Sequence, residues 1–193
     1  MKSAIRSLAL TAVFLILATT ASLADTRVWL MYGLGDNFLW TSNGIDQIAR
    51  QARQIPGVTV VYVRNYWETQ RIADEVMATP AKSKIVIGGY SCGANSATVI
   101  ARGLYGYRKI NTVTGIQQSA WCGGYPLYSN VSYGQMTFAG CVQTYGLGCK
   151  RLRAGQGFNG RIRNIRRPAR HGYADNDPDA QQDVLRAIRM TAQ

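Results

Sequence analysis

The sequence predicts a single α/β domain of three layers, in which a mostly parallel sheet of about six strands carries helices on both faces. Two observations support this prediction. Runs of β-branched residues such as Ile85-Val86-Ile87 contain no polar side chain, as expected for strands that are buried on both faces. Segments of helical periodicity, such as residues 45–55, lie between these runs, and neighbouring parallel strands need crossover connections of this kind.

The expected elements alternate along most of the chain. Strands are expected at residues 27–32, 58–63, 85–87, 110–116, 135–145 and 161–166, and helices at 45–55, 67–77 and 94–102. A last helix is expected to begin near Asp177-Pro178-Asp179, because an acidic N-cap followed by proline is typical of a helix start. Residues 119–134 are expected to form a long loop, and the fifth strand could extend into a hairpin near Cys141.

The N-terminus has the three-part layout of a secretory signal peptide. A basic start is followed by an apolar run from Leu8 to Ala18 and by Ser22-Leu23-Ala24, which fits a cleavage site. The apolar run is too short for a stable membrane span, and no second long run follows it. We therefore expect residues 1–24 to be removed, residues 25–193 to form the mature domain without a membrane span, and the protein to be secreted or periplasmic.

The sequence contains four cysteines, Cys92, Cys122, Cys141 and Cys149. In an oxidising compartment an even number of cysteines favours two disulfides over four free thiols. Three pairings are possible, and we favour Cys141 with Cys149 and Cys92 with Cys122. The spacing contains no C-x-x-C motif and His171 is the only histidine, so no metal site is predicted.

The expected mature chain is strongly basic, because removal of Lys2 and Arg6 leaves 20 of the 22 Lys and Arg residues against 10 acids. Eight of these basic residues lie between Lys150 and Arg170, a stretch without one acid. Such a surface can bind anionic lipid, polysaccharide or nucleic acid, although a basic stretch more often serves to keep a protein soluble. The basic residues are not interleaved with aromatics and no nucleic-acid motif is present, so we expect no specific nucleic-acid partner.

The stretch Lys84 to Ala94 reads K-I-V-I-G-G-Y-S-C-G-A and contains a G-x-S-x-G pattern centred on Ser91. The pattern follows an expected strand and precedes residues of helical composition. A strand, a tight turn that carries a serine, and a helix together predict a nucleophilic serine at the N-terminus of that helix. The alternative interpretation is a glycine-rich turn with a helix-capping serine.

Three features are expected at the carboxyl edge of the sheet, where ligands bind in open α/β folds. Ser91 follows the third strand, the Gly33-Leu34-Gly35 turn follows the first, and His171 follows the last. A serine hydroxyl needs a neighbouring base to take its proton, and His171 is the side chain suited to that task. The backbone amides of Cys92 and Leu34 are the candidate donors to the oxyanion of acyl transfer.

The order of strand, glycine loop, G-Y-S-C-G motif and late histidine resembles the α/β-hydrolase family of serine esterases, lipases and thioesterases. The motif, with the expected secretion and disulfides, is also similar to small cutinase-like members. The resemblance implies Ser91 as nucleophile, His171 as general base, and the Leu34 and Cys92 amides as the oxyanion hole. It also implies a small or polymeric ester or thioester as substrate, and we expect no cofactor.

The sequence departs from the family pattern at the third catalytic residue. The family places an Asp or Glu between the serine and the histidine to orient the imidazole, but residues 76–174 contain neither. Gln118-Ser119-Ala120 and residues 144–149 stand where that acid is expected. Asp175, four residues beyond His171, is the tentative orienting acid, although a place in the cap of the last helix is the more common role for such a residue. Asp36, Ser119 or a backbone carbonyl could orient the imidazole instead.

Two functional hypotheses follow. The first is a secreted serine hydrolase that forms an acyl-enzyme on Ser91. The second is a hydrolase-fold protein with weak or no catalysis that binds an anionic partner through the Lys150 to Arg170 region, since loss of the orienting acid alone can cost several powers of ten in rate. In the loop over the expected site, Trp121, Tyr125 and Tyr128 could either line a substrate pocket or pack the loop itself.

Overall fold

A computed structural model describes residues 25–34, 43–141 and 147–193 of the 193-residue chain. The expected signal peptide and Asp36 lie outside these residues. The strands are β1 (Thr26–Met31), β2 (Val58–Arg64), β3 (Lys84–Tyr90), β4 (Ile110–Ile116), β5 (Val131–Phe138) and β6 (Arg161–Arg166). The helices are α2 (Gly44–Ala52), α3 (Thr69–Ala78), α4 (Cys92–Gly103) and α5 (Pro178–Ala192), with the 3-10 helix η1 (His171–Asn176) before α5.

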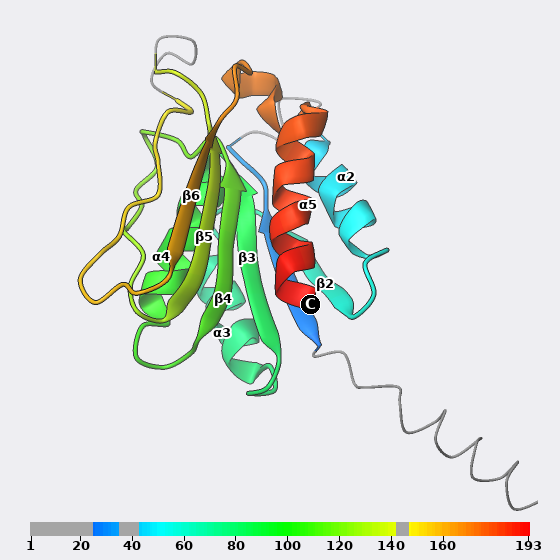
Figure 1. The fold of residues 1–193 in the computed structure, drawn as a ribbon, viewed down its shortest axis with the longest axis vertical. Helices are drawn as coiled ribbons and strands as arrows, with labels where there is room; N and C mark the ends of the chain where they lie inside the picture. Colours follow the sequence, from blue (N-terminus) through cyan, green and yellow to red (C-terminus); the bar gives the residue numbers. More distant parts are fainter. Residues whose placement is uncertain (1–24, 35–42, 142–146) are drawn as a thin grey trace, which may run out of the picture.

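The strands form one six-stranded sheet in the order β2-β1-β3-β4-β5-β6, and every neighbouring pair is parallel (Figure 1). The chain leaves β1 toward β2 and then returns to the other side of β1 to form β3. The strand order therefore reverses between β1 and β3, and open α/β sheets bind ligands at the carboxyl ends of the strands at such a reversal. The predicted fold class is confirmed.

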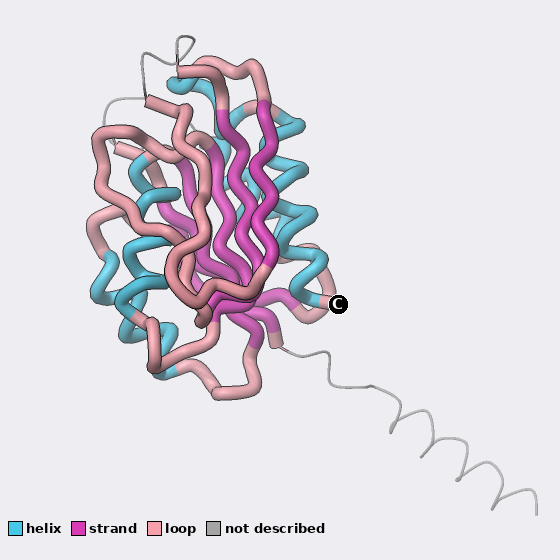
Figure 2. The backbone as a smooth tube through the Cα atoms, turned by 60° about the vertical axis from the view of Figure 1, so that its left-hand side comes forward, coloured by secondary structure: helices cyan, strands magenta, loops and turns pink. Residues whose placement is uncertain are grey.

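Helices cover both faces of the sheet, which gives the three expected layers (Figure 2). Side chains alternate along a strand, so Ile85 and Ile87 of β3 pack in the core beneath α3 and α4, whereas Val86 packs in the core beneath α2 and α5. All three side chains are fully buried. The unbroken apolar run therefore has the physical cause proposed from the sequence, burial on both faces.

The fifth strand differs from its expected position. It covers Val131–Phe138, whereas we expected residues 135–145 after a loop that reached Gly134. Val131 is fully buried and pairs with Ile110 at the start of β4, so the strand begins earlier than the mixed polarity of Val131 to Gly134 indicated. The expected lengthening into a hairpin near Cys141 is wrong for the described residues, because β5 ends at Phe138 and its partners β4 and β6 are both parallel to it.

Two disulfides join Cys92 to Cys122 and Cys141 to Cys149, which is the pairing favoured from the sequence. Disulfides are compatible with an extracellular or otherwise oxidising compartment. Among the residues that the structure describes, no helix is long and apolar enough to cross a membrane.

An ion pair anchors the segment that runs from β6 to α5 and carries His171. Asp183 is 1% exposed, and its two carboxylate oxygens accept from Nε and Nη2 of Arg167 at 3.1 and 3.3 Å. The Arg167 backbone N–H also donates to Phe138 O at 2.8 Å, so this arginine ties the end of β5 to α5. These bonds fix where the chain turns back across the carboxyl edge of the sheet.

We predict that Asp183→Asn lowers the free energy of unfolding by about 2 kcal/mol, because it removes a buried charge-assisted partner of Arg167. Urea unfolding of both proteins at neutral pH measures this change. Asp179→Asn is the matched control, since Asp179 accepts from the same guanidinium at 3.2 Å but its side chain is 74% exposed. The control should change stability by less than about 0.5 kcal/mol, and equal effects of the two variants would contradict the assignment.

Candidate active site

Ser91 occupies the turn between β3 and α4 with φ 53° and ψ −121°. This conformation lies in a region that residues with a side chain rarely adopt, and it costs on the order of 1–3 kcal/mol. A strained serine at the end of a parallel strand and the start of a helix is the geometry that the G-x-S-x-G pattern predicted. Serine as an ordinary N-cap is disfavoured, because its side chain makes no capping hydrogen bond to α4.

The two glycines of the motif are required by close packing against the end of β1. A Cβ atom at Gly89 would lie 2.6 Å from Met31 O, and one at Gly93 would lie 2.6 Å from Tyr32 O. Neither position has room for a side chain, since the obstructing atoms are backbone. The glycines therefore let the turn that carries Ser91 approach the carboxyl end of β1 and the Gly33-Leu34 turn that follows it.

His171 lies within hydrogen-bond distance of Ser91, with its Nε2 atom 2.8 Å from Ser91 Oγ. The chain reaches this point by turning back after β6 and crossing the carboxyl edge of the sheet. The Tyr90 hydroxyl, directly before the serine, donates to the backbone carbonyl of His171, and the two rings are 5.3 Å apart between centroids. The nucleophile–base pair predicted from the sequence is therefore brought together.

The second ring nitrogen of His171 contacts Gln117, the residue directly after β4. The distance from His171 Nδ1 to Gln117 Oε1 is 3.0 Å, and Gln117 Nε2 donates to the Ala169 carbonyl at 2.8 Å. The bond to Ala169 fixes which end of the amide faces the ring, so Oε1 is the acceptor and Nδ1 carries the proton. Nε2 then presents its lone pair to the Ser91 hydroxyl, as a general base must.

Gln117 has the position that we expected an acid to hold, and sequence reasoning missed it. The residues considered, Gln118-Ser119-Ala120, begin one position too late. The signal that could have identified Gln117 is its place as the first polar residue after the fourth strand, whose predicted end at Ile116 is correct. A glutamine at the end of a strand is otherwise ordinary, since only the tertiary structure brings it to His171.

The tentative assignment of Asp175 as the orienting residue is corrected by this geometry. Asp175 is 1% exposed and lies in η1, where its carboxylate faces the start of α2. A Cβ atom at Gly44, the first residue of α2, would lie 2.7 Å from Asp175 Oδ2. The carboxylate thus sits at the positive end of a helix dipole, and the Nδ1 atom of His171 has Gln117 as its partner instead. Ser119, another candidate, bonds to Asn95.

Backbone strain is concentrated at these two positions. Among the described residues, Ser91 (φ 53°) and Gln117 (φ 47°) are the non-glycine residues with positive φ. Both follow central strands directly, and both contact the His171 ring. Strained conformations persist where the surrounding structure holds them, and they cluster at active sites. Strain at both partners of one imidazole marks this edge of the sheet as the candidate active site.

A glycine covers the hydrogen bond between His171 and Gln117. The Cβ position of Gly148 lies against Gln117 Oε1 and 2.8 Å from His171 Nδ1, so no side chain fits there. Gly148 precedes Cys149 of the second disulfide, and its carbonyl accepts from Ala139 N at 3.0 Å. The backbone at Gly148 therefore packs directly against the imidazole–amide pair.

The candidate oxyanion donors follow two adjacent strands, Leu34 after β1 and Cys92 after β3. Cys92 is the first residue of α4 and is 2% exposed, and an amide at this position has no acceptor within its own helix. Leu34 follows β1 in the turn that Gly89 and Gly93 approach, and it is 61% exposed. The backbone amides of Cys92 and Leu34 therefore belong to segments that meet at Ser91. The oxyanion hole itself stays a prediction.

Burial lowers the pKa of His171 from 6.5 to about 4. Desolvation penalises the imidazolium form, and Gln117, being neutral, supplies no charge that would offset it. The ring is therefore neutral at pH 7 and able to accept a proton from Ser91.

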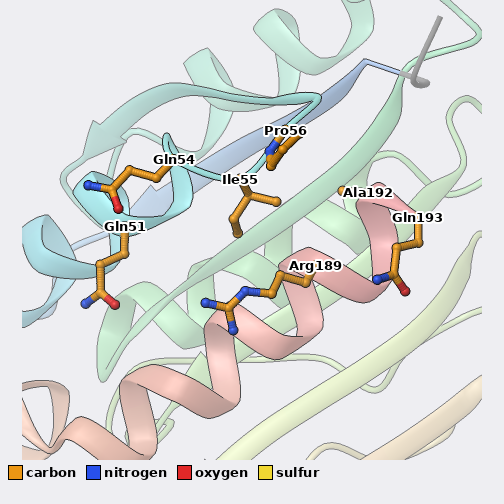
Figure 3. A pocket seen from close by; sticks show the side chains of 7 residues that line it. All are labelled: Gln51, Gln54, Ile55, Pro56, Arg189, Ala192 and Gln193. Atoms are coloured by element: carbon orange, nitrogen blue, oxygen red, sulfur yellow. The ribbon is translucent and has the colours of Figure 1, made fainter. Parts of the chain in front are cut away.

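Among the described residues, no group of three or more His, Cys, Asp and Glu side chains is placed to hold a metal ion. A pocket of about 520 Å³ lies elsewhere, between the ends of α2 and α5 (Figure 3). Its lining includes Gln51, Ile55 and Arg189 but neither Ser91 nor His171. Its distance from the strained residues in the fold gives it no part in the chemistry considered below.

Comparison with models of known protein families finds no match, and comparison with curated protein sequences finds none either. The function is therefore argued from the geometry of the site.

The lowered pKa of His171 predicts an acid-dependent loss of stability. Above pH 6.5 the ring is neutral in both states; as the pH falls from 6.5 to about 4, the unfolded chain binds a proton that the folded protein excludes. The free energy of unfolding should fall by about 3 kcal/mol over this interval on this account. Urea unfolding of the parent and of His171→Asn between pH 6.5 and about pH 4 isolates the contribution of His171, because all other titratable groups are present in both proteins. Parallel stability curves for the two proteins would contradict the prediction.

Proposed function

We propose that the protein is a serine hydrolase that cleaves an ester or thioester through an acyl-enzyme on Ser91. The observation that carries this proposal is the continuous chain of contacts from Gln117 through His171 to Ser91, at 3.0 and 2.8 Å. A serine on a strained turn, bonded to a half-buried neutral histidine whose other nitrogen is held by an acceptor, is the arrangement that activates a hydroxyl for acyl transfer.

The reaction proceeds in two halves. Ser91 Oγ bonds to the substrate carbonyl carbon, the carbonyl electron pair moves to oxygen, and the hydroxyl proton passes to Nε2 of His171. As the tetrahedral intermediate collapses, the bond to the leaving alkoxide or thiolate breaks and His171 gives that group the proton. Water then attacks the acyl-enzyme and loses its proton to His171, which returns it to Ser91 Oγ as the carboxylic acid leaves.

Gln117 orients the imidazole in this scheme without neutralising the charge that it acquires. The amide holds the tautomer with the proton on Nδ1, since Oε1 accepts and Nε2 is committed to Ala169. A carboxylate would also stabilise the imidazolium that forms when Ser91 is deprotonated. We therefore propose a positioning role for Gln117, with a lower intrinsic rate and a more acidic working range than a carboxylate would give.

We propose further that the protein works outside the cytoplasm, as secreted or periplasmic protein after removal of residues 1–24. The layout of the N-terminal sequence supports this location, and the two disulfides are compatible with it.

A second candidate function is binding of an anionic partner through the Lys150 to Arg170 region, with little or no catalysis. The observation in its favour is charge: the region has eight basic residues and no acid, and of these Arg167 is ion-paired with Asp179 and Asp183. Retention on an anionic polymer that weakens with salt and survives loss of Ser91 would support it.

Labelling with a fluorophosphonate tests the hydrolase proposal directly. We expect the purified mature protein to gain the mass of one adduct and to hydrolyse small activated esters. Ser91→Ala should gain no adduct and lose turnover, because the reacting oxygen is absent. A folded parent protein that remains unlabelled would overturn the proposal, as would unchanged esterase turnover in Ser91→Ala.

The pH profile of ester hydrolysis tests the role of Gln117. The acid limb of kcat/KM should lie near pH 4, where His171 becomes protonated. Gln117→Glu should move this limb upward by about one to three pH units, because a carboxylate beside the ring favours the imidazolium.

Gln117→Leu is the control for this variant, since it removes the acceptor while keeping an apolar side chain of similar size. It should lower kcat by about 100-fold, as expected when a catalytic group is misplaced. If Glu and Leu at position 117 leave both the pH limb and kcat as in the parent, Gln117 does not orient His171.

A further inference from the structure

The connection from β4 to β5 lies along α4 and is fastened to it over the whole length of the helix. The anchor points on α4 are Cys92, Asn95, Thr98 and Ala101, so each point neighbours the next on the helix surface and the series turns about halfway around the helix. Their contacts are the Cys92–Cys122 disulfide, Asn95 Nδ2 to Ser119 O at 3.0 Å, Tyr125 N to Thr98 Oγ1 at 3.0 Å, and Asn130 Nδ2 to Ala101 O at 2.8 Å. The side chains of this connection are therefore held at fixed places along α4.

Four aromatic residues, Trp121, Tyr125, Tyr128 and Tyr105, follow this connection and the end of α4, and we call them the aromatic strip. Trp121 is 77% exposed, Tyr125 42% and Tyr105 48%. The Arg102 guanidinium lies over the Tyr125 ring at 4.3 Å and bonds to the Tyr128 hydroxyl at 2.9 Å, and the Tyr128 and Tyr105 rings are 5.4 Å apart. Arg102 thus links Tyr125 to Tyr128, and Tyr128 contacts Tyr105, while Trp121, Tyr125 and Tyr105 remain exposed.

The aromatic strip begins beside the nucleophile. Cys92, which follows Ser91, is bonded to Cys122, which follows Trp121. The far end of the strip is Tyr105, just beyond the C-terminus of α4 at Gly103. A helix of this length spans roughly 18 Å, so the strip extends from the candidate active site over a distance that suits several units of a polymer.

The surroundings of the aromatic strip are basic. The chain has no Asp or Glu between residues 76 and 174, which includes α4 and the connection. Arg102 and Lys109 are exposed at the far end of α4. The basic region approaches as well, since Leu127 N donates to the backbone carbonyl of Arg153 at 2.9 Å and the Arg153 side chain is exposed.

Rigid, exposed aromatic faces and cations along one track match a particular ligand chemistry. Sugar rings have flat C–H faces that pack on aromatic side chains, and guanidinium groups bind carboxylates. An acyl chain would instead need an enclosed apolar cleft, and the strip is open and carries phenol hydroxyls and a guanidinium. We propose that the aromatic strip binds an acidic polysaccharide that bears the ester cleaved at Ser91. Cleavage of that ester rests on the proposed function, whereas binding of the polysaccharide does not.

The test measures binding without turnover. The Ser91→Ala protein is titrated with polygalacturonate at low and high salt by calorimetry. We expect binding that weakens with salt, because it depends in part on exposed charges. Tyr105→Ala and Tyr125→Ala, each in the Ser91→Ala background, should weaken binding by about five- to tenfold through loss of a stacking face.

Tyr62→Ala is the matched control for these variants. Tyr62 is also 48% exposed and also has an arginine over its ring, with Arg64 Cζ at 3.6 Å, but it belongs to the edge strand β2. It should bind as the Ser91→Ala protein does. Arg102→Gln, an exposed substitution that spares the fold, should weaken binding and reduce its salt dependence, and Tyr105→Phe should retain affinity because it keeps the ring.

Polyglutamate separates this proposal from attraction between charges alone. It carries carboxylates without sugar rings, so it should bind more weakly and respond equally little to Tyr105→Ala and Tyr62→Ala. Absence of polygalacturonate binding, equal effects of the three tyrosine variants, or equal affinity for both polymers would overturn the proposal. Polygalacturonate binding by a protein that fluorophosphonate does not label would support the binding strip and overturn the hydrolase.

Discussion

The position of one imidazole ring is the constraint on which the carboxyl edge of this sheet depends. His171 contacts Ser91 at the end of β3 and Gln117 at the end of β4. His171 follows β6 in the chain, so three segments that are distant in the sequence meet at its ring. Parallel strands bring their carboxyl ends to the same edge, and the Arg167–Asp183 pair and the Tyr90 hydroxyl hold the returning segment. The strain at Ser91 and Gln117 is compatible with stability because these surrounding contacts are satisfied.

The choice of a neutral partner for His171 fits the burial of the site. Gln117 is fully buried, and a carboxylate at this place would have to lose its hydration. An amide can orient the imidazole at a smaller desolvation cost than a carboxylate. Its Nε2 group also has an acceptor, the backbone carbonyl of Ala169. The consequence is a ring that protonates only in acid, since burial opposes the imidazolium and no negative charge favours it.

The two disulfides and three glycines contribute to the surroundings of His171 in different ways. Each disulfide fastens a segment next to the site: Cys92–Cys122 joins the residue after Ser91 to the long connection over α4, and Cys141–Cys149 holds the segment of Gly148. Gly89, Gly93 and Gly148 then provide the close approach, because a side chain at any of them would collide with neighbouring atoms. The glycines thus allow backbone to pack against the pair of hydrogen bonds, and each disulfide adds a covalent link beside it.

The sequence by itself determined the fold class, the turn at Ser91 and the histidine that lies beside it. Hydrophobic runs, glycine spacing and helix starts are local, so they act over a few residues and can be read directly; β4 and β6 have the predicted bounds. The partner of His171 was decided by tertiary structure alone. Gln117 lies 54 residues from the histidine, and their contact depends on strand order and on how the chain recrosses the sheet edge. Asp175 is the acid nearest to His171 in the sequence, but its carboxylate lies against Gly44 at the start of α2.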